Sequence, residues 1–247
     1  MTYQTTAQRS QSVYCGKEPS HAKDLLRANA RFLLRSLGKA VSFVQVGAND
    51  GERGDLLSPL IREQQWRGVL VEPVPQAMER LRKTYEGCDG LLFQQVAIWP
   101  DSSPPQFWVV EGDDQLSSFS HDTIMLHAGK YDDLEQRTSA IPVQFMRLDE
   151  LCRECAIEPD VIAVDAEGCD DIVLSSYDLS KSPPAAIFFE HVMLSKDRSL
   201  AMRERLDALG YVQMADRHDC LAVLPDRFSS ELVTHFSEIQ RLMRNGS

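Results

Sequence analysis

Short apolar runs alternate with amphipathic segments over most of the chain. The runs have the length of strands, and between them apolar residues recur at helical spacing. Strands that alternate with helices form a mostly parallel sheet with helices on both faces. The pattern therefore predicts an α/β domain whose first strands lie at residues 40–46, 68–73, 91–99, 160–165 and 185–191.

The two ends of the chain follow a different pattern. A polar tail and a helix are expected over residues 1–38, and an amphipathic helix over 226–247. The stretches YVQMA and CLAVLP before the last helix are typical of a closing hairpin, which predicts one antiparallel strand near an edge of the sheet. We expect a single domain over 1–247, with its core over 40–225. The helical apolar positions expected to face inward include Leu25, Leu26, Phe32, Leu33, Leu200 and Leu206.

The alternation of strands and helices breaks at residues 100–140. This insertion holds one short strand, QFWVV, and long polar stretches. A loop of this length in a compact domain is usually a lid or a binding element. Its histidines, His121 and His127, lie either on the loop surface or against a bound acceptor.

Composition and charge exclude several kinds of partner. The formal net charge is −11 and no cluster of lysine and arginine stands out, so we expect no nucleic acid and no anionic membrane as partner. The chain has no apolar run near the roughly 18 residues of a membrane span. The N-terminus has no apolar signal segment, so a cytoplasmic location is expected. Cys152 and Cys155 form a lone C-x-x-C, interpreted as helix surface rather than a metal or redox site.

The first strand leads into a glycine-containing loop, FVQVGANDG, at residues 43–51. Ligands of doubly wound sheets bind at the carboxyl ends of the strands, where this loop is expected to lie. A dinucleotide loop needs G-x-G-x-x-G and a Walker loop needs G-K-[ST], and neither occurs here. Asp50, Glu52 and Asp55 would repel a pyrophosphate. The same carboxylates suit a cationic ligand without phosphate, such as S-adenosylmethionine.

The second strand supports a cofactor site. Its stretch GVLVEP places Glu72 at the strand end, 21 residues after Gly51. A carboxylate there accepts hydrogen bonds from both hydroxyls of a ribose. Taken alone, Glu72 could be a solvated residue at a strand end, but the order and spacing of the two motifs favour a cofactor site.

Six stretches of sequence, taken in order, resemble the FkbM-type methyltransferases, a class I S-adenosylmethionine-dependent group. The resemblance covers roughly residues 40–225 and implies a class I methyltransferase Rossmann-like fold with a seven-stranded sheet. It also implies transfer of a methyl group to a hydroxyl of a glycan or a natural product, with S-adenosylhomocysteine as the second product. The stretches are FVQVGANDG, WRGVLVEPVP, QQVAI, RLDEL, VIAVDAEGCDDIVL and AIFFEH.

The sequence departs from the family pattern at three places. Gln45 stands where the family frequently has Asp, and Gln95 where it frequently has Asn. The usual D-x-E-G-x-E or D-x-E-G-Y-D is DAEGCD, over residues 165–170. Gln45 therefore places no charge beside the loop at this position.

Candidate site residues follow from the loop, the strand ends and the resemblance. Cofactor contacts are expected from Gln45, Gly47, Ala48, Asn49, Asp50, Gly51, Glu72, Pro73, Gln95, Val96, Ala97, Ser118 and Asp165. An acceptor hydroxyl reacts once a base or a metal takes its proton. The strand ends offer Asp165, Glu190 and His191 as catalytic residues. A divalent ion among them stays open, but no metal ligand is predicted. Asp170 and Asp171 are interpreted as a solvated helix start.

Alternative interpretations belong to other classes of protein. Tyr177 and Lys181 fit the Y-x-x-x-K pair of short-chain dehydrogenases, but Pro183 and Pro184 follow at once and the glycine pattern is wrong, which disfavours an NAD-dependent oxidoreductase. A non-catalytic binding or partner protein on a methyltransferase scaffold is the other alternative. The terminal helices could also pack a homodimer. The expected partner otherwise is a small-molecule or glycan acceptor.

Overall fold

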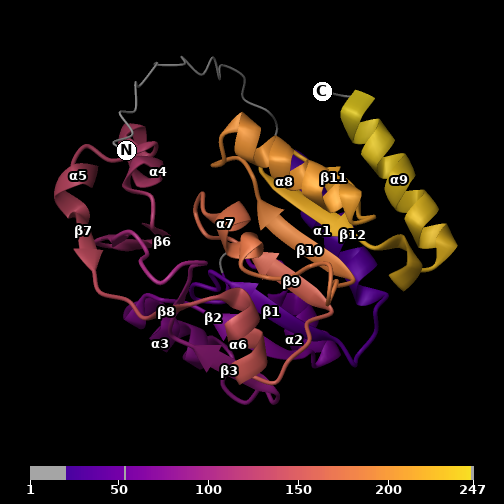
Figure 1. The fold of residues 1–247 in the computed structure, drawn as a ribbon, viewed down its shortest axis with the longest axis horizontal. Helices are drawn as coiled ribbons and strands as arrows, with labels where there is room; N and C mark the ends of the chain where they lie inside the picture. The colour runs from indigo at the N-terminus through magenta and orange to yellow at the C-terminus, as the bar shows by residue number, and fades with distance from the viewer. Residues whose placement is uncertain (1–20, 53, 246–247) are drawn as a thin grey trace.

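A computed structural model describes residues 21–52 and 54–245 of this chain. The centre of the fold is a seven-stranded sheet with the order β11-β12-β10-β9-β1-β2-β3 (Figure 1). The expected class I methyltransferase architecture, with a mostly parallel sheet and one antiparallel strand, is confirmed. That strand is β12, which lies between β10 and the edge strand β11. The strands are β1 (Ser42–Val46), β2 (Arg67–Val71), β3 (Leu91–Gln94), β9 (Val161–Val164), β10 (Ala186–Glu190), β11 (Val212–Ala215) and β12 (Asp219–Val223).

The strand order reverses at β1, which makes the end of β1 the switch point of the sheet. β1 pairs in parallel with β2 on one side and with β9 on the other. In this register Val46 lies opposite Val71 of β2 and opposite Val164 of β9. The residues that follow these three strands therefore meet at one edge of the sheet.

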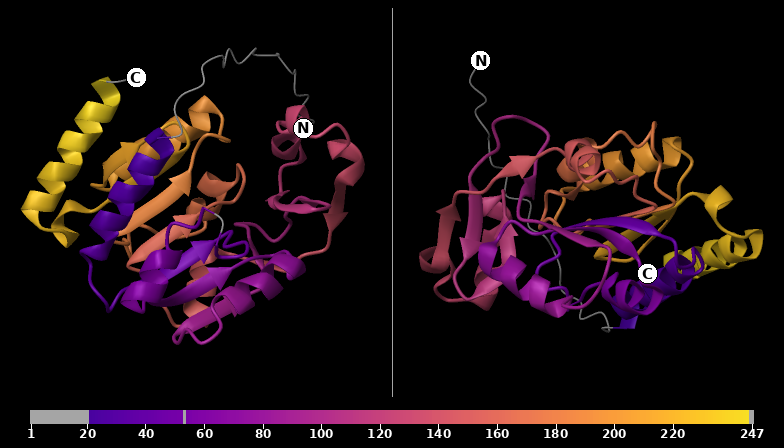
Figure 2. Two further views of the ribbon diagram at one scale, coloured as in Figure 1. Left: turned by 180° about the vertical axis from the view of Figure 1, so that it is seen from behind. Right: turned by 90° about the horizontal axis from the view of Figure 1, so that it is seen from below.

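Two layers of helices cover the sheet, because successive strand residues point to opposite faces. Phe43 packs with helices on one face, and its neighbour Val44 packs with helices on the other. In the right-hand view of Figure 2, α8 lies on one side of the sheet and α1 and α9 on the other. The first layer is α1 (His21–Arg35), α2 (Ser58–Gln64), α3 (Pro75–Thr84) and α9 (Ser230–Asn245), and the second is α6 (Leu148–Glu154), α7 (Asp170–Ser175) and α8 (Lys196–Ala208).

Some side chains predicted to face inward do not. Leu26 and Leu33 of α1 are buried as expected, but Leu25 and Phe32 are exposed, and so is Leu200 of α8. Adjacent residues on a helix differ by about 100° in direction, so Leu25 and Phe32 point away from the sheet while Leu26 and Leu33 face it. Conversely, Cys152 of α6, which was predicted to lie on the helix surface, is buried. Residues 1–20 of the expected N-terminal tail lie outside the described residues.

The predicted strand at 91–99 is divided in two. Its first part is the edge strand β3, whereas β4 (Ala97–Ile98) pairs with β8 (Phe145–Met146) in a separate two-stranded sheet. The chain leaves the main sheet between them, and Val96 and Ala97 are buried beside the carboxyl ends of β1 and β2. Because the predicted strand is divided, Val96 and Ala97 lie at the edge of the sheet where a ligand is expected to bind.

The insertion is more ordered than the sequence pattern predicts. It forms a three-stranded antiparallel sheet with the order β6-β5-β7, where a polar loop with one strand was expected. Val110, Leu116, Ile124 and Leu134 give it a small apolar core of its own. Figure 1 shows it at the end of the molecule opposite α9. Its elements are β5 (Phe107–Val110), β6 (Asp113–Ser118), α4 (His121–Met125), η1 (Ala128–Lys130), α5 (Leu134–Arg137) and β7 (Thr138–Ile141).

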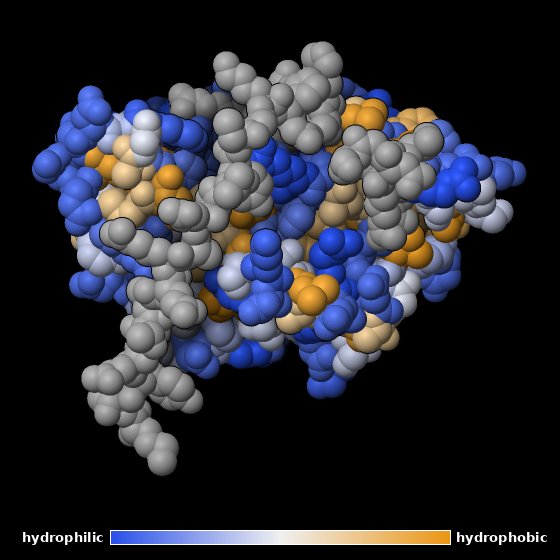
Figure 3. Space-filling view, turned by 90° about the horizontal axis from the view of Figure 1, so that it is seen from above, coloured by the Kyte–Doolittle hydropathy of each residue, from blue (hydrophilic) through white to orange (hydrophobic). Residues whose placement is uncertain are grey.

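The face of the molecule that is seen from above is mainly polar. In the space-filling view from above (Figure 3), hydrophobic residues form small separate groups among hydrophilic ones. Within the part of the chain that the structure describes, no helix has the length and apolar character needed to cross a membrane.

Candidate active site

A cavity of about 580 Å³ lies at the carboxyl ends of β1, β2, β9 and β10. Its walls come from the loop after β1, the strand ends, α1 and the insertion. This is the place where doubly wound sheets bind their ligands. The predicted site residues that line it are Gln45, Gly47, Ala48, Asn49, Glu72, Pro73, Val96, Ala97, Asp165 and Glu190.

The loop after β1 is held by backbone contacts on both sides. The amides of Gly47 and Ala48 donate to the carbonyl oxygen of Val71, each at 3.0 Å. Gly47 has φ +76°, and a Cβ at this position would lie 1.8 Å from the carbonyl oxygen of Asp165. Only glycine fits between β2 and β9 in this conformation. The close approach of three strand ends thus fixes the floor of the cavity.

Glu72 lies at the centre of the loop contacts. It is only 3% exposed, and its Oε2 accepts a hydrogen bond of 3.0 Å from the amide of Asn49. Its Oε1 accepts one of 2.8 Å from the amide of Val74. Burial, the largest cause, raises the pKa of Glu72 to about 7. The carboxylate is therefore rigidly placed, and its remaining lone pairs can accept hydrogen bonds from vicinal hydroxyls of a ligand.

Gln45 forms a buried polar pair with Asp55. Its Nε2 donates to Oδ2 of Asp55 at 3.1 Å. The other oxygen of Asp55 accepts from the amides of Leu57 and Ser58, before and at the start of α2. Gln45 is 8% exposed, and its Oε1 has no hydrogen-bond partner among the described residues. A buried acceptor without a partner at a cavity wall is suited to a ligand donor.

Three predicted cofactor contacts do not line the cavity. Asp50 is buried, and its Oδ1 accepts a hydrogen bond from the amide of Glu52 inside the loop. Gly51 lies against α3, where a Cβ would come within 2.6 Å of the Tyr85 ring. Gln95 is exposed at the point where the chain leaves the main sheet. Asp50 and Gly51 therefore shape the loop. From the predicted strand that contains Gln95, it is Val96 and Ala97 that line the cavity.

Ser118 is also behind the cavity wall, not on it. Its Oγ donates to the carbonyl oxygen of Glu167 at 2.8 Å and accepts from the amide of Ser120 at 3.0 Å. Glu167 has φ +44°, an uncommon conformation for a residue with a side chain. Ser118 therefore joins the insertion to the loop after β9 instead of covering a cofactor directly.

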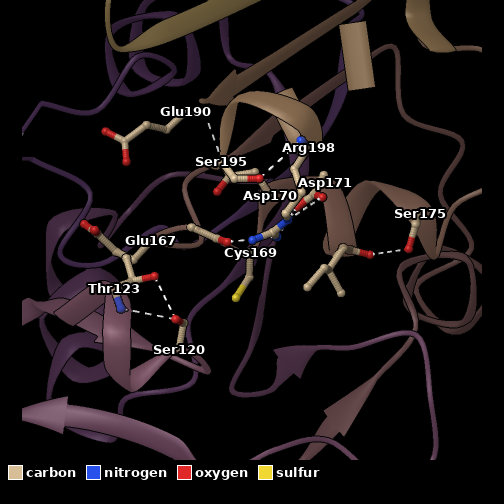
Figure 4. A network of polar contacts seen from close by, with 12 residues as sticks. Ser120, Thr123, Glu167, Cys169, Asp170, Asp171, Ser175, Glu190, Ser195 and Arg198 are labelled. Carbon is tan, nitrogen blue, oxygen red and sulfur yellow. Dashed lines mark hydrogen bonds and ion pairs between the residues drawn. The ribbon is translucent and has the colours of Figure 1, made fainter. Parts of the chain in front are cut away.

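A group of carboxyls stands at the ends of β9 and β10. Asp165 and Glu190 line the cavity, and Asp170 is fully buried behind them. The amide of Glu190 donates to Oδ1 of Asp170 at 3.1 Å, while the Glu190 side chain is directed away from it (Figure 4). The interpretation of Asp170 as a solvated helix start is wrong. Burial first, and then the charges of Asp165 and Glu190, raise its pKa well above the usual range.

The next residue, Asp171, behaves as expected for a helix start near the surface. Its carboxylate pairs with the guanidinium of Arg198 from α8 (Figure 4). Arg198 also donates to the carbonyl oxygen of Gly168 at 3.0 Å, so α8 holds the loop that carries Asp165.

His191 does not reach the cavity. Its Nδ1 lies 3.3 Å from Oγ of Ser199, and its Nε2 lies 3.0 Å from the carbonyl oxygen of Asp216. Successive residues at a strand end point to opposite sides, so Glu190 faces the cavity and His191 faces α8. The expected catalytic placement of His191 is therefore corrected to a structural one. Among the residues that the structure describes, no three His, Cys, Asp or Glu side chains are grouped to hold a metal ion.

Several cavity residues were missed by the sequence interpretation. Arg27 reaches the cavity from α1, where its Nε donates to Oδ2 of Asp219 at 2.8 Å. From the insertion, the Tyr131 hydroxyl donates to the carboxylate of Asp113. Nδ2 of Asn49 donates to Asp114 at 3.4 Å. No motif marks these residues, because they come from segments without a fixed spacing to the loop.

The two histidines of the insertion have different positions. His127 lines the cavity, and burial, followed by the charge of Lys130, lowers its pKa. His121 packs against Trp108 with ring centroids 4.6 Å apart and does not line the cavity. His127 therefore lies where it can contact a bound acceptor, whereas His121 does not.

Solved structures with a similar fold include several methyltransferases. Methyltransferase FkbM from Methylobacillus flagellatus KT has 16% identity and a TM-score of 0.49, and the match covers 75% of this chain but only 44% of that one. Precorrin-6y C5,15-methyltransferase from Geobacter metallireducens GS-15 has 11% identity and a TM-score of 0.41, with 87% and 92% covered. Aeropyrum pernix fibrillarin with natively bound S-adenosyl-L-methionine has 12% identity and a TM-score of 0.39, with 81% and 73% covered.

The comparison with protein families gives a direct assignment. None of the curated proteins compared matches the sequence. The family model for the methyltransferase FkbM domain matches residues 45–212, which is more than half of the chain and includes β1, the loop, Glu72, Asp165 and Glu190. The resemblance noted from the six stretches is thereby confirmed, and the chain belongs to the FkbM methyltransferase domain family.

Proposed function

We propose that this protein is an S-adenosylmethionine-dependent O-methyltransferase that acts on a hydroxyl of a glycan or natural-product acceptor. The observation that carries the proposal is the position of Glu72. Its buried carboxylate faces a cavity of about 580 Å³, between a glycine-fixed loop and the strand ends. A cavity of that volume is within the usual range for small-molecule and cofactor sites.

The cavity residues fit this cofactor in charge and in hydrogen bonding. Glu72 would accept the two ribose hydroxyls, and Val96 and Ala97 would form an apolar wall for the adenine. The loop over Gly47–Asn49 would hold the methionine portion. No lysine or arginine lies in the described part of this loop to bind a phosphate. Most charged residues that line the cavity are carboxylates, in agreement with a sulfonium and an ammonium on the ligand.

When bound, S-adenosylmethionine supplies a methyl group that is already activated by its sulfonium. The protein then has to position the acceptor hydroxyl and accept its proton. Asp165 and Glu190 are the candidates, because both line the cavity at adjacent strand ends. Asp170 lies behind them, and burial and the charges of its neighbours raise its pKa, which favours its neutral form.

The cofactor assignment is tested by calorimetric titration with S-adenosylmethionine and S-adenosylhomocysteine. The wild-type protein is expected to bind both, and Glu72→Ala is expected to lower the affinity by at least about tenfold, through lost hydrogen bonds to a charged acceptor. Glu79→Ala, on the exposed face of α3, is the matched control and should bind normally. No binding by the wild type, or equal binding by the Glu72 variant, would contradict the assignment.

The reaction type is tested with Asp165→Asn and Glu190→Gln. Both variants should keep their affinity for S-adenosylhomocysteine but transfer labelled methyl to hydroxyl acceptors at least a hundredfold more slowly. The products of wild-type turnover are identified by mass spectrometry. Methyl groups on nitrogen or carbon would rule out the O-methyltransferase proposal. Activity that survives exhaustive chelation would remove a divalent metal from the mechanism.

A further inference from the structure

We infer that Arg27, Gln45 and Asp55 form a subsite for an α-amino-acid group, with Arg27 binding the carboxylate and the Gln45–Asp55 pair binding the ammonium. The inference rests on the proposed function, because the amino-acid group is that of S-adenosylmethionine. It adds a part of the site that is supplied by α1, which precedes the segment matched by the family model.

Arg27 is a fixed cation in the cavity. Its Nε is bonded to Asp219, its Nη1 donates to the carbonyl oxygen of Gly54, and its guanidinium lies 5.6 Å from the centroid of the Phe188 ring. The side chain of Arg27 is 14% exposed and that of Asp219 is 1% exposed. These contacts hold the guanidinium in place before a ligand arrives. An arginine that is preorganised in this way loses little entropy on binding a carboxylate.

The charges of the cavity wall favour the ligand carboxylate, rather than its ammonium, at Arg27. Among the described residues that line the cavity, only Arg27 and Lys130 carry a full positive charge. Lys130 belongs to the insertion, whereas Arg27 bonds to Gly54 in the loop segment before α2. The other charged lining residues are carboxylates: Asp55, Glu72, Asp113, Asp114, Asp165, Glu167 and Glu190. A ligand carboxylate near the loop therefore meets a favourable partner at Arg27.

The ammonium position follows from the adjacent residue. Arg27 bonds to Gly54, and Asp55, the next residue, accepts a hydrogen bond from Gln45. The two charged groups of an α-amino acid are on the same carbon, so their binding groups must be close neighbours. The unpartnered Oε1 of Gln45 can accept from an ammonium, and the Asp55 carboxyl lies beside it. Burial raises the pKa of Asp55, and a ligand ammonium next to it would favour its ionised form. In this arrangement Asp55 provides the carboxylate that position 45 lacks relative to the family pattern.

The subsite is tested with two ligands that differ only at the amino-acid end. S-adenosylhomocysteine carries the amino acid, whereas 5′-methylthioadenosine ends in a methyl group. Calorimetry without an acceptor should show that the wild type binds S-adenosylhomocysteine at least tenfold more tightly. Arg27→Gln should remove most of this difference, by lowering the affinity for S-adenosylhomocysteine at least tenfold and that for methylthioadenosine less than twofold. Gln45→Leu should act in the same direction, with a smaller loss.

The control variant is Asp219→Asn, which removes the ion partner of Arg27 but keeps the guanidinium. Because the guanidinium remains and only its positioning is loosened, this variant should lower the affinity for S-adenosylhomocysteine less than Arg27→Gln does. If Arg27 were only structural, Arg27→Gln would change the affinities for both ligands equally, and that result would overturn the inference. Arg27→Lys and Gln45→Leu decide the matter if thermal unfolding shows that Arg27→Gln is not folded. A wild type that binds neither ligand would reject the proposed function, whereas a wild type that binds both equally would reject the subsite alone.

Discussion

The loop after β1 and the insertion both line the cavity, but they are held there in different ways. The loop is fixed by main-chain contacts, with amides of Gly47 and Ala48 on Val71 and the amide of Asn49 on Glu72. The insertion meets the rest of the molecule through side chains: Phe107 and Phe119 pack in a buried apolar cluster with Val74, Ala77 and Cys169, and Asp114 pairs with Arg80 of α3. It also has a small apolar core of its own.

This difference separates two tasks. Backbone contacts tolerate little movement, which suits a part of the site that holds the same ligand in every reaction. Exposed ion pairs at the rim of the insertion contribute little stability and can change without damage to the fold. We therefore propose that the loop side of the cavity binds the cofactor and that the insertion side recognises the acceptor. The predictions below would break or sharpen that division.

The largest effect is expected for Gly47→Ala. A methyl group here meets the carbonyl oxygen of Asp165 at 1.8 Å, and the residue must also keep φ +76°. Gly87→Ala is a matched control, because Gly87 has φ +80° and open space around its Cβ position. The control should lose about 1–2 kcal/mol of unfolding free energy from the left-handed conformation alone. Gly47→Ala should lose several kcal/mol and all measurable binding of S-adenosylhomocysteine.

Urea unfolding and calorimetry measure both variants. If Gly47→Ala lost no more stability than Gly87→Ala, the strand ends would be able to move apart. The loop would then be no more rigid than the insertion, and the division of tasks would fail.

The same difference explains what could be predicted from the sequence. The loop needs a glycine at Gly47 and a carboxylate at Glu72, and both requirements are local, so they leave a motif. Arg27 and Tyr131 reach the cavity through tertiary packing, which leaves no fixed spacing. His191 follows a strand end as Glu190 does, but the alternation of side chains turns it towards Ser199. The seven-stranded sheet was predictable because its apolar strands alternate clearly with amphipathic helices. The three paired strands of the insertion were not, because their sequence is mostly polar.

A tenfold effect of pH on binding is expected from Glu72. Its pKa in the free protein is raised to about 7, and hydroxyl donors of a ligand favour the ionised carboxylate. Binding should therefore weaken as the pH falls below about 7, by roughly tenfold from pH 8 to pH 6, and it should release protons. Calorimetry in buffers of different ionisation enthalpy measures both quantities. Affinity that is independent of pH in this window would mean that Glu72 does not contact the ligand.

A comparable change in stability is expected from Asp170, the buried acid behind Asp165 and Glu190. Because its folded-state pKa is raised, the folded protein keeps a proton that the unfolded chain loses above about pH 4. Wild-type stability thus falls as the pH rises towards the folded-state pKa of Asp170. Asp170→Asn does not titrate and keeps an acceptor for the amide of Glu190. Its stability relative to wild type should rise by at least about 1 kcal/mol between pH 5 and pH 8.

Urea unfolding at the two pH values measures this difference. Asp171→Asn is the neighbouring control, since it breaks the surface pair with Arg198 and should lower stability at both values. A constant difference between Asp170→Asn and wild type would show that Asp170 is ionised in the folded protein. The site would then carry a negative charge behind Asp165 and Glu190 that the proposed mechanism does not use.

The smallest effect is expected at the boundary between the two regions. Asp114→Asn weakens the pair with the half-exposed Arg80 and the contact with Asn49, which together contribute about 1 kcal/mol or less. Hydrogen exchange should become faster in β5, β6 and β7 but not in β1 or β2. The affinity for S-adenosylhomocysteine should change less than threefold, whereas KM for the acceptor should rise more. Asp122→Asn, at an exposed position of α4, is the control. Faster exchange in β1 would mean that the loop depends on the insertion for its rigidity, and the cofactor and acceptor sides would then act as one unit.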